Sequence, residues 1–248
     1  MFIRRHHLFR LRLSLVIIFL VVGITIFRQP KPVIKTANIR GAIIPHHLVA
    51  KELMVDLGNR LSTQKIPQII IIGPNHFELG RYHLLTDNNS ISQGFLYYDS
   101  DVVNQDHACN APRTVLQKIL PQTKFSCILI STRVTPDEIN SLSVYLKKVL
   151  GSNNVLIASV DFSHYLPMRQ AQENDLITWN YLSKFDTISL LKLKDHFLDS
   201  PQTITLLFNY LNKINALNST KINNLNSAQI LNTPDLPSTT SYLEIIYQ

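Results

Sequence analysis

Short, uninterrupted apolar runs set the strongest limit on what this chain of 248 residues can fold into. The clearest runs are QIIII at residues 68–72, FSCILIS at 125–131 and VLIASV at 155–160. Strands that are buried on both faces of a parallel sheet have this composition, whereas strands with one face in water alternate apolar and polar residues. The runs therefore predict a central sheet that is covered on both faces.

Helical patterns separate the predicted strands. Residues 48–61 (LVAKELMVDLGNRL) have the apolar spacing of an amphipathic helix, and TPDE at 135–138 is a helix start with a capping threonine, a proline and two acids. Further strands are expected at 38–44 and 241–247, and the Asn-rich stretch 215–232 is expected to form a polar surface excursion. Alternating strands and helices predict an α/β fold, a three-layer sandwich with a largely parallel or mixed central sheet and helices on both faces.

The N-terminal part carries a different signal. Residues 1–12 form a basic leader, residues 13–27 (LSLVIIFLVVGITIF) contain no charge, and residues 28–37 have the composition of a short extended linker. A basic flank before an apolar run keeps the N-terminus in the cytoplasm, so we interpret 13–27 as a single N-terminal transmembrane helix that anchors the protein in the membrane. A cleaved signal segment and a buried core helix are the alternatives. Both membrane interpretations place the α/β domain, residues 38–248, outside the cytoplasm.

Charge and cysteine content exclude two classes of function. The formal net charge is +7, but arginines concentrate around the N-terminal apolar run and the remaining chain is close to balanced, so no nucleic-acid surface is expected. The two cysteines, Cys109 and Cys127, are too few for a disulfide scaffold or a cysteine zinc site. They could still pair with each other.

Histidines follow three of the predicted strands. They are His46 and His47 after the first strand, His76 after QIIII and His164 after VLIASV. In open α/β sheets, ligands bind outside the carboxyl ends of the strands, so these side chains are expected to meet in one cleft. A single histidine after a strand is commonly a loop or capping residue, but three such positions among nine histidines favour a shared site. Imidazole binds zinc, copper and iron alike, so the spacing does not name the metal.

Four motifs resemble those of a known family. PHH at 45–47, GPNH at 73–76, DH at 106–107 and DFSHY at 161–165 are similar, in the same order, to the PHAGY, GP-x-H, EHS and SDFSHYG motifs of the Memo-like family. This family includes AmmeMemoRadiSam system protein B, and its fold is similar to that of the class III extradiol ring-cleaving dioxygenases. The resemblance covers residues 38–248 and implies a functional link to AMMECR-type and radical SAM proteins.

A metal site follows from the resemblance. It implies that His46 and His76 are metal ligands and that His164 lies beside the metal as an acid/base catalytic residue. The third ligand of the family is a cysteine, whose position corresponds to Asp199 in this sequence. Two histidines and one carboxylate are typical of non-haem iron(II) oxygenases, so a divalent metal is expected, with iron or copper favoured and zinc as a further candidate. Asp199 could instead cap the helix that follows it.

Four other residues near the motifs have two interpretations each. His107 either lines the cleft or lies in a surface loop, and Asp161 either orients a cleft histidine or caps the segment after it. Tyr165 either points into the cleft or packs in the core. Cys109 is either a thiol that faces the cleft or a small buried one.

The sequence departs from the family beside these motifs. Leu48 and Val49 replace a Gly-Tyr pair, and DHACN at 106–110 lacks the serine and the second acid of the family's EHS-x-E segment. Part of the hydrogen bonding that orients metal ligands is thereby lost. His47 and His83 are expected to be structural.

Together these features favour a metal-dependent enzyme, either a redox enzyme or a dioxygenase-like enzyme, with metal-assisted hydrolysis as a variant. The alternative is a non-catalytic, membrane-tethered module whose cleft binds a peptide or a metal, because a lost or altered reaction would fit the departures from the family. The expected ligand is an unidentified small molecule or peptide, since no motif selects a ring, a sugar or a peptide.

Overall fold

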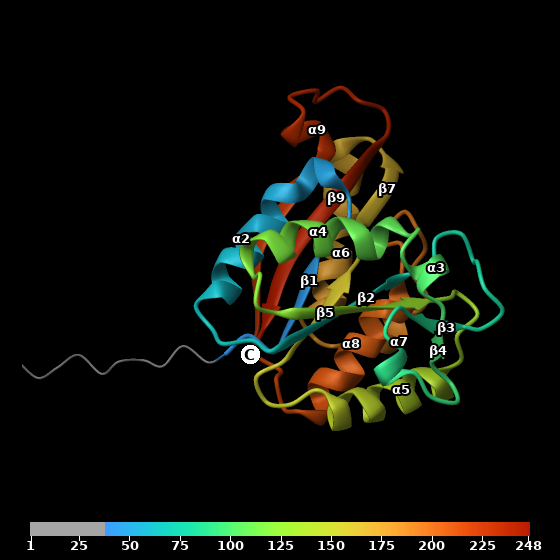
Figure 1. Ribbon diagram of the computed structural model, residues 1–248. Helices are drawn as coiled ribbons and strands as arrows, with labels where there is room; N and C mark the ends of the chain where they lie inside the picture. The colour runs from blue at the N-terminus through green and yellow to red at the C-terminus, as the bar shows by residue number, and fades with distance from the viewer. Residues whose placement is uncertain (1–37) are drawn as a thin grey trace, which may run out of the picture. The chain divides into compact units, whose positions relative to one another are not determined.

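Four parallel strands form the centre of the sheet in the computed structural model, which describes residues 38–248 (Figure 1). In spatial order they are β5 (Lys124–Ile130), β2 (Gln68–Pro74), β6 (Val155–Ser159) and β1 (Gly41–Ile44). Every residue of β6 and all but the first of β2 are buried, as the apolar runs predict. Because β6 lies between β1 and β2, the carboxyl ends of these three strands are neighbours.

Further strands extend this centre on both sides into one nine-stranded mixed sheet. β9 (Thr239–Tyr247) pairs antiparallel with β1, and β7 (Phe162–Leu166) and β8 (Ser219–Asn226) both pair antiparallel with β9. On the other side, β3 (Leu84–Thr86) pairs antiparallel with β5, and β4 (Tyr97–Tyr98) pairs parallel with β3.

Helices cover both faces of the sheet (Figure 1). On one face lie α2 (Lys51–Ser62) and α4 (His107–Ile119). On the other face lie α5 (Pro136–Val149), α6 (Met168–Leu182) and α8 (Pro201–Lys213). The predicted α/β sandwich with a central sheet and helices on both faces is thus confirmed.

The isoleucines of β2 show how one strand serves two cores. Ile69 and Ile71 pack with the helices α2 and α4, whereas Ile70 and Ile72 pack with α5 and α8. Successive side chains of a strand point to opposite faces of the sheet, so a strand covered on both faces needs an apolar residue at every position. This requirement explains why QIIII lacks the alternation of a half-exposed strand.

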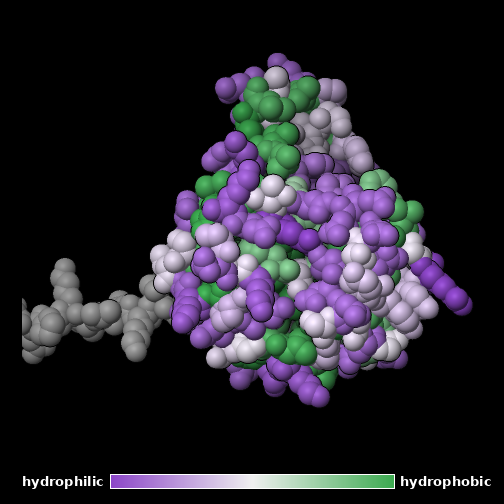
Figure 2. Space-filling model, in the orientation of Figure 1, coloured by the Kyte–Doolittle hydropathy of each residue, from purple (hydrophilic) through white to green (hydrophobic). Residues whose placement is uncertain are grey.

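Short helices complete the described part of the chain: η1 (Leu48–Ala50), η2 (Asn89–Ile91), α3 (Ser100–Val103), α7 (Thr187–Leu190) and α9 (Ser227–Ile230). A small third apolar cluster lies near α9 and consists of Ala50, Leu53 and Tyr242 with the partly buried Leu225 and Ile230. Figure 2 shows apolar side chains at the surface of the end that carries α9, where Leu231 is exposed.

Two expectations about local structure need correction, and one is confirmed. The Asn-rich stretch 215–232 is not only a surface excursion, because it contains β8 and α9. Strand pairing uses main-chain groups, so β8 can pair with β9 although its polar side chains do not form a strand pattern in the sequence. The helix expected at 48–61 begins with a 3-10 turn, since η1 runs directly into α2. The predicted start of α5 is confirmed, with a reciprocal capping box between Thr135 and Glu138.

The predicted N-terminal transmembrane helix, residues 13–27, lies outside the described residues, as do the leader and the linker. Between residues 38 and 248, none of the helices is both long enough and apolar enough to span a membrane.

A disulfide joins Cys109 in α4 to Cys127 in β5. Both side chains are buried in the core on the α2/α4 face. The interpretation of Cys109 as a thiol facing the cleft is therefore wrong, because its position in the first turn of α4 directs it toward β5.

Glu244 of β9 is a fully buried carboxyl group outside the candidate site, and it predicts a pH-dependent stability. Burial raises the pKa of Glu244 from 4.5 to about 7. A hydrogen bond from Asn223 Nδ2 to Glu244 Oε2 (2.7 Å) works in the opposite direction and lowers this pKa. The folded chain then holds this proton more tightly than the unfolded chain does, so the free energy of unfolding falls as the pH rises through this range. Between about pH 5 and pH 7, we expect Glu244 to lower the free energy of unfolding by about 2 kcal/mol. In Glu244→Gln this decrease should be absent.

Urea unfolding of the wild type and of Glu244→Gln at both pH values measures this difference. Glu52→Gln, an exposed change in α2, is the control and should leave the pH profile unaltered. Equal slopes for the wild type and Glu244→Gln would show that the carboxyl group is not protonated in the folded protein.

Candidate metal centre

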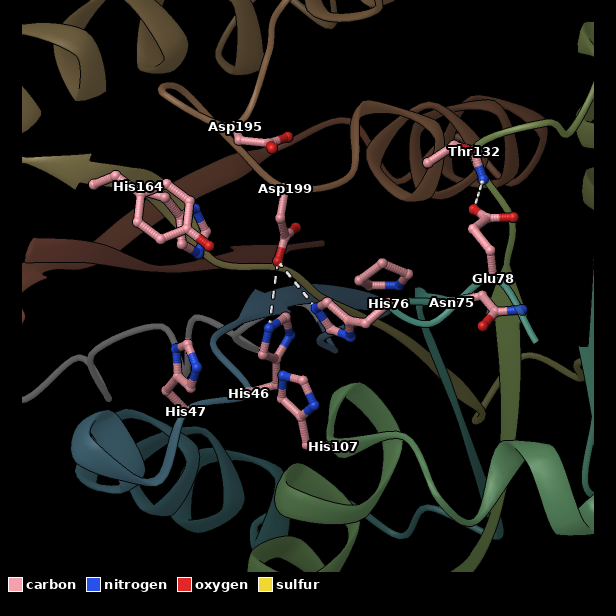
Figure 3. Close-up of a pocket in the computed structure, with 12 residues that line it drawn as sticks. His46, His47, Asn75, His76, Glu78, His107, Thr132, His164, Asp195 and Asp199 are labelled. Carbon is pink, nitrogen blue, oxygen red and sulfur yellow. Dashed lines mark hydrogen bonds and ion pairs between the residues drawn. The ribbon is translucent and has the colours of Figure 1, made fainter.

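A cavity of about 450 Å³ opens at the carboxyl ends of β1, β2 and β6. Five of the nine histidines of the chain line it, together with acidic and polar residues from several loops (Figure 3). The lining residues are His46, His47, Pro74, Asn75, His76, Glu78, His107, Thr132, His164, Tyr165, Asp195 and Asp199. The volume lies within the range of small-molecule sites, roughly 300–1,000 Å³.

His46 leaves the end of β1 and is almost completely buried. Its Nδ1 lies 3.4 Å from the main-chain oxygen of Ser159 at the end of β6. A carbonyl oxygen only accepts hydrogen bonds, so this contact favours a proton on Nδ1 and directs Nε2 toward the carboxylates of Asp161 (3.5 Å) and Asp199 (3.3 Å). The main-chain N–H of His46 donates to Asp161 Oδ1 (3.0 Å), which fixes the backbone at this position.

His76 follows β2 and is held by Asp106. Its Nδ1 lies 2.8 Å from Asp106 Oδ1, and its main-chain N–H donates to Asp106 Oδ2 (2.9 Å). Asp106 also accepts from the N–H of Ala108 and so caps α4. Burial opposes the charged form of His76, but the hydrogen bond with Asp106 and the nearby carboxylate of Asp199 raise its pKa to about 9. With Nδ1 bonded to a carboxylate, the Nε2 atom of His76 faces the cavity.

Asp106 is a site residue that the sequence analysis did not single out. Burial alone would raise its pKa, but the hydrogen bonds and charge of His76 hold that pKa below the ordinary value. A carboxylate behind a histidine is the usual arrangement that orients a metal ligand. The DH motif contained the signal, since Asp106 stands at the acidic position of the family's EHS motif.

Asp199 points at both of these histidines. Its Oδ2 lies 3.3 Å from His46 Nε2 and 3.8 Å from His76 Nε2 (Figure 3). The same oxygen accepts a hydrogen bond from the main-chain N–H of Asp161 (3.2 Å). The helix α8 is capped by Ser200, whose Oγ accepts from the N–H of Thr203. The alternative role of Asp199 as the cap is therefore excluded.

His107 completes a group of three histidines. One ring nitrogen from each of His46, His76 and His107 lies within 4.8 Å of the others, which is close enough for a shared metal ion. The rings of His76 and His107 are stacked, with centroids 4.1 Å apart and an interplanar angle of 18°, whereas the rings of His46 and His76 are nearly perpendicular at 86°. Burial and the neighbouring positive charge of His76 lower the pKa of His107 to about 4.

Asp161 lies buried behind the cluster and contacts two neighbouring histidines. Its Oδ2 is 3.5 Å from His46 Nε2 and 2.5 Å from His47 Nδ1. Burial alone would raise the pKa of Asp161, but His46 and His47 keep it below the ordinary value. His47 was expected to be structural, but it lines the cavity, and its contact with Asp161 raises its pKa. The residue is thus part of the site.

His164 reaches the cavity from β7, an antiparallel strand that the sequence analysis did not expect. Both of its neighbours have positive φ angles, 25° at Ser163 and 61° at Tyr165. Such backbone costs about 1–3 kcal/mol per residue and is common at functional sites. Ser163 Oγ donates to the buried Asp175 Oδ1 (2.7 Å), which holds this irregular segment. His164 is mostly buried, and its Nδ1 has no hydrogen-bond partner among the described residues.

The sequence model of the Memo family, described as Memo-like protein, matches residues 89–245, which is more than half of the chain. The chain belongs to the Memo-like family. MEMO1 family protein MK0963 of Methanopyrus kandleri is 24% identical over 151 residues, which cover 52% of this chain and 53% of that protein. The match thus spans about half the length of that relative.

The fold is also similar to that of a solved structure. The crystal structure of uncharacterized protein JW3007 from Escherichia coli K12 matches with a TM-score of 0.52 and 11% identity, over 83% of this chain and 99% of that one. At this identity the similarity concerns the fold alone. The resemblance to extradiol dioxygenases is consistent with this fold and stays a prediction.

The Memo-like motifs converge in space, although the matched segment contains only some of them. Residues 89–245 include the DH and DFSHY motifs and Asp199 but not the PHH and GPNH motifs, which the fold brings to the same cavity. All predicted site residues except Cys109 line the cavity or lie directly behind it. Tyr165 lines it with 69% of its surface exposed, so it does not pack in the core. His83 lies outside the cavity lining and pairs with Glu138 (3.0 Å).

Proposed function

We propose that this Memo-like protein is a metal-dependent redox enzyme of the dioxygenase-like kind, with His46, His76 and Asp199 as ligands of one divalent ion. The observation that carries the proposal is the position of Asp199 Oδ2, which faces the Nε2 atoms of both histidines. Two histidines and one carboxylate with other positions open are typical of non-haem iron(II) oxygenases. Iron and copper are therefore favoured, and zinc is a further candidate.

The donor groups fit such an ion. Ser159 and Asp106 lie against the Nδ1 atoms of His46 and His76, so both Nε2 atoms are directed at the space beside Asp199. Asp199 Oδ1 is buried and has no partner among the described residues, which leaves it free to bind a cation. With a bound ion in place of the proton that His76 otherwise carries, one carboxylate and two imidazole nitrogens would form a donor set that iron and copper accept.

His107 is a weaker candidate for the third ligand. The lone pair of an imidazole nitrogen lies in the plane of its ring. The stacked rings of His76 and His107 therefore direct their lone pairs along parallel planes, and one ring must rotate before both can bind one ion. The nearly perpendicular rings of His46 and His76 need no such rotation.

In the proposed reaction, the metal would supply Lewis acidity and a redox centre for the activation of oxygen or substrate. His164 would move a proton between the cavity and the substrate, because it is buried with Nδ1 unpaired. Asp106 and Asp161 would hold the histidines in place.

Metal content and turnover test the proposal together. The wild type should take up one iron(II) or copper(II) per chain, His46→Ala should lose this uptake, and His83→Ala, which lies outside the cavity lining, should retain it. Oxygen consumption with a panel of catechols, measured beside ester and phosphoester cleavage, would separate the redox enzyme from the hydrolytic variant. His164→Ala should abolish turnover while its metal content stays unchanged; a wild type that takes up no metal would refute the proposal.

A non-catalytic role is the second candidate, and the group of three histidines favours it. If the ring of His107 rotates toward the ion, four protein ligands surround it, and sites of that kind bind metal without leaving a position for substrate. Such a module would bind a metal or a peptide rather than transform a substrate. Metal uptake without any oxygen consumption or hydrolysis, lost equally in His107→Ala and Asp199→Ala, would support this role.

The hydrogen bond between Asp106 and His76 gives a specific expectation for metal affinity. Asp106→Asn should lower the affinity for the ion about tenfold, because orienting partners of a ligand contribute roughly 10–100-fold. Asparagine is also a good helix cap, so α4 should remain capped. Asp99→Asn at the cap of α3 is the matched control, and calorimetric titration with the metal should show no change for it.

Location and partners are proposed on two further grounds. A buried disulfide persists in oxidising compartments and is rare in the cytosol, which supports a domain outside the cytoplasm, tethered through the N-terminal segment. Family membership supports a functional link to AMMECR-type and radical SAM proteins. Alkylation of the protein, unfolded directly from its own cells without a reductant, would test the location. A disulfide leaves no thiol to react, so alkylated cysteines would contradict it.

A further inference from the structure

The charges around the cavity are unequally compensated. Three carboxylates line it, those of Glu78, Asp195 and Asp199, and none of the lining residues is a lysine or an arginine. Asp199 faces His46 and His76, as described above. Because histidines contact Asp199, a positive group of a ligand would be bound by a carboxylate that no histidine contacts.

The carboxylate of Glu78 already has partners within the protein. Its Oε2 accepts from Ser131 Oγ (2.5 Å) and lies 3.3 Å from Arg133 Nε, and its Oε1 accepts from the N–H of Thr132 (2.7 Å). These groups hold the pKa of Glu78 below its ordinary value although burial works against them. Glu78 therefore has little capacity left for a ligand cation.

Asp195 is different, because its carboxylate has no hydrogen bond or ion pair within residues 38–248. Lys192 and Lys194 stand on the same segment, but both are exposed, neither lines the cavity, and neither pairs with Asp195. In Figure 3 Asp195 and Asp199 lie on the same side of the cavity, across from His46 and His107. Asp195 thus offers an exposed carboxylate without a direct partner at the cavity.

The main chain holds Asp195 beside the proposed catalytic residue. The carbonyl oxygen of Asp195 accepts from the N–H of His164 (3.0 Å), and that of Phe197 accepts from the N–H of Ser163 (2.9 Å). A ligand group on Asp195 is therefore also near His164. Tyr165 lines the same part of the cavity with an exposed ring, which can pack against an aromatic ligand.

We infer that the cavity takes a small aromatic amine, with its ammonium group on Asp195 and its ring between Tyr165 and the histidines. The inference rests on the proposed function, because the far end of the ligand would face the metal ligands His46 and His76. A volume of about 450 Å³ accommodates a molecule of this size. Asp195 then determines specificity without touching the metal.

Two probes that differ only in a terminal ammonium group test the inference. Tyramine and 4-ethylphenol share a ring, a hydroxyl group and a two-carbon chain, but tyramine ends in an ammonium group. Calorimetric titrations of the zinc-loaded protein should show that tyramine binds roughly fivefold to tenfold more tightly, as a charge-assisted hydrogen bond in a partly exposed site provides. Asp195→Asn should abolish this preference and leave the affinity for 4-ethylphenol unchanged, and Asp235→Asn, an exposed acid outside the cavity, should retain it.

Three results would overturn the inference: equal affinities of the wild type for the two probes, a preference that persists in Asp195→Asn, or no tyramine binding at millimolar concentration. The same titrations with metal-free protein separate it from the proposed function. A chain that binds no metal contradicts the proposed function alone, because the preference for the amine depends on Asp195 and is measured independently.

Discussion

Asp199→Ala should lower the affinity for iron(II) or copper(II) about 100-fold, the largest effect expected at the candidate site. Structural zinc sites with four ligands gain roughly 10–16 kcal/mol, or on the order of 3 kcal/mol for each ligand. Removing Asp199 also removes the carboxylate oxygen that lies near the Nε2 atoms of both His46 and His76. Competition titration with a chelator of known affinity measures the change.

The matched control for this prediction is Asp195→Ala. Asp195 stands four residues earlier on the same segment and lines the same cavity, but it has no contact with a histidine ring. Its loss should change metal affinity by less than about twofold, the size of a weak exposed interaction. His107→Ala should have an effect between the two, because the stacked ring of His107 is not directed at the ion. A loss in His107→Ala as large as that in Asp199→Ala would favour the four-ligand module.

Replacing both cysteines by alanine should lower the free energy of unfolding by about 3 kcal/mol, the stabilisation expected for a disulfide that closes a loop of this length. Cys109 and Cys127 are 18 residues apart, and their side chains are fully buried. The cross-link restricts the unfolded chain, and in the folded protein it ties the first turn of α4 to β5. That turn also carries His107.

Urea unfolding of the double variant and of the wild type, both without reductant, measures this loss. Adding a reductant that opens the disulfide should destabilise the wild type and leave the double variant unchanged, which separates the cross-link from the packing of the two sulfur atoms. If the free energies of unfolding agree within about 1 kcal/mol, the disulfide does not restrict the unfolded chain as this model requires.

Much of the fold could be predicted because its signals are local. The run QIIII is buried on both faces of the sheet as β2, and TPDE is the capped start of α5. β8 could not be predicted, since its polar residues lack a strand pattern and its main chain is ordered by pairing with β9. The antiparallel strand β7 was missed for a related reason, because irregular pairing with β9 and positive φ angles interrupt it.

The candidate site divides in the same way. The histidines at the ends of β1 and β2 could be predicted to meet, because parallel neighbouring strands end at one edge of a sheet. Asp106 was not singled out, since its partner His76 lies 30 residues away and only the folded chain joins them. The sequence left the location of Cys109 open, because it does not show which side of the first turn of α4 packs against β5.

The sequence by itself determined the layered α/β architecture, the membership of the Memo-like family and the set of histidines that face one cavity. It did so because burial on both faces of a sheet and the shared edge of parallel strands leave a direct pattern in the chain. Only the tertiary structure excluded Asp199 as the cap of α8. Asp199 and Ser200 are adjacent oxygen-bearing residues before α8, and either could cap it; Ser200 does so, and Asp199 faces His46 and His76. That choice depends on where β1 and β2 end in space, which no local pattern around Asp199 encodes.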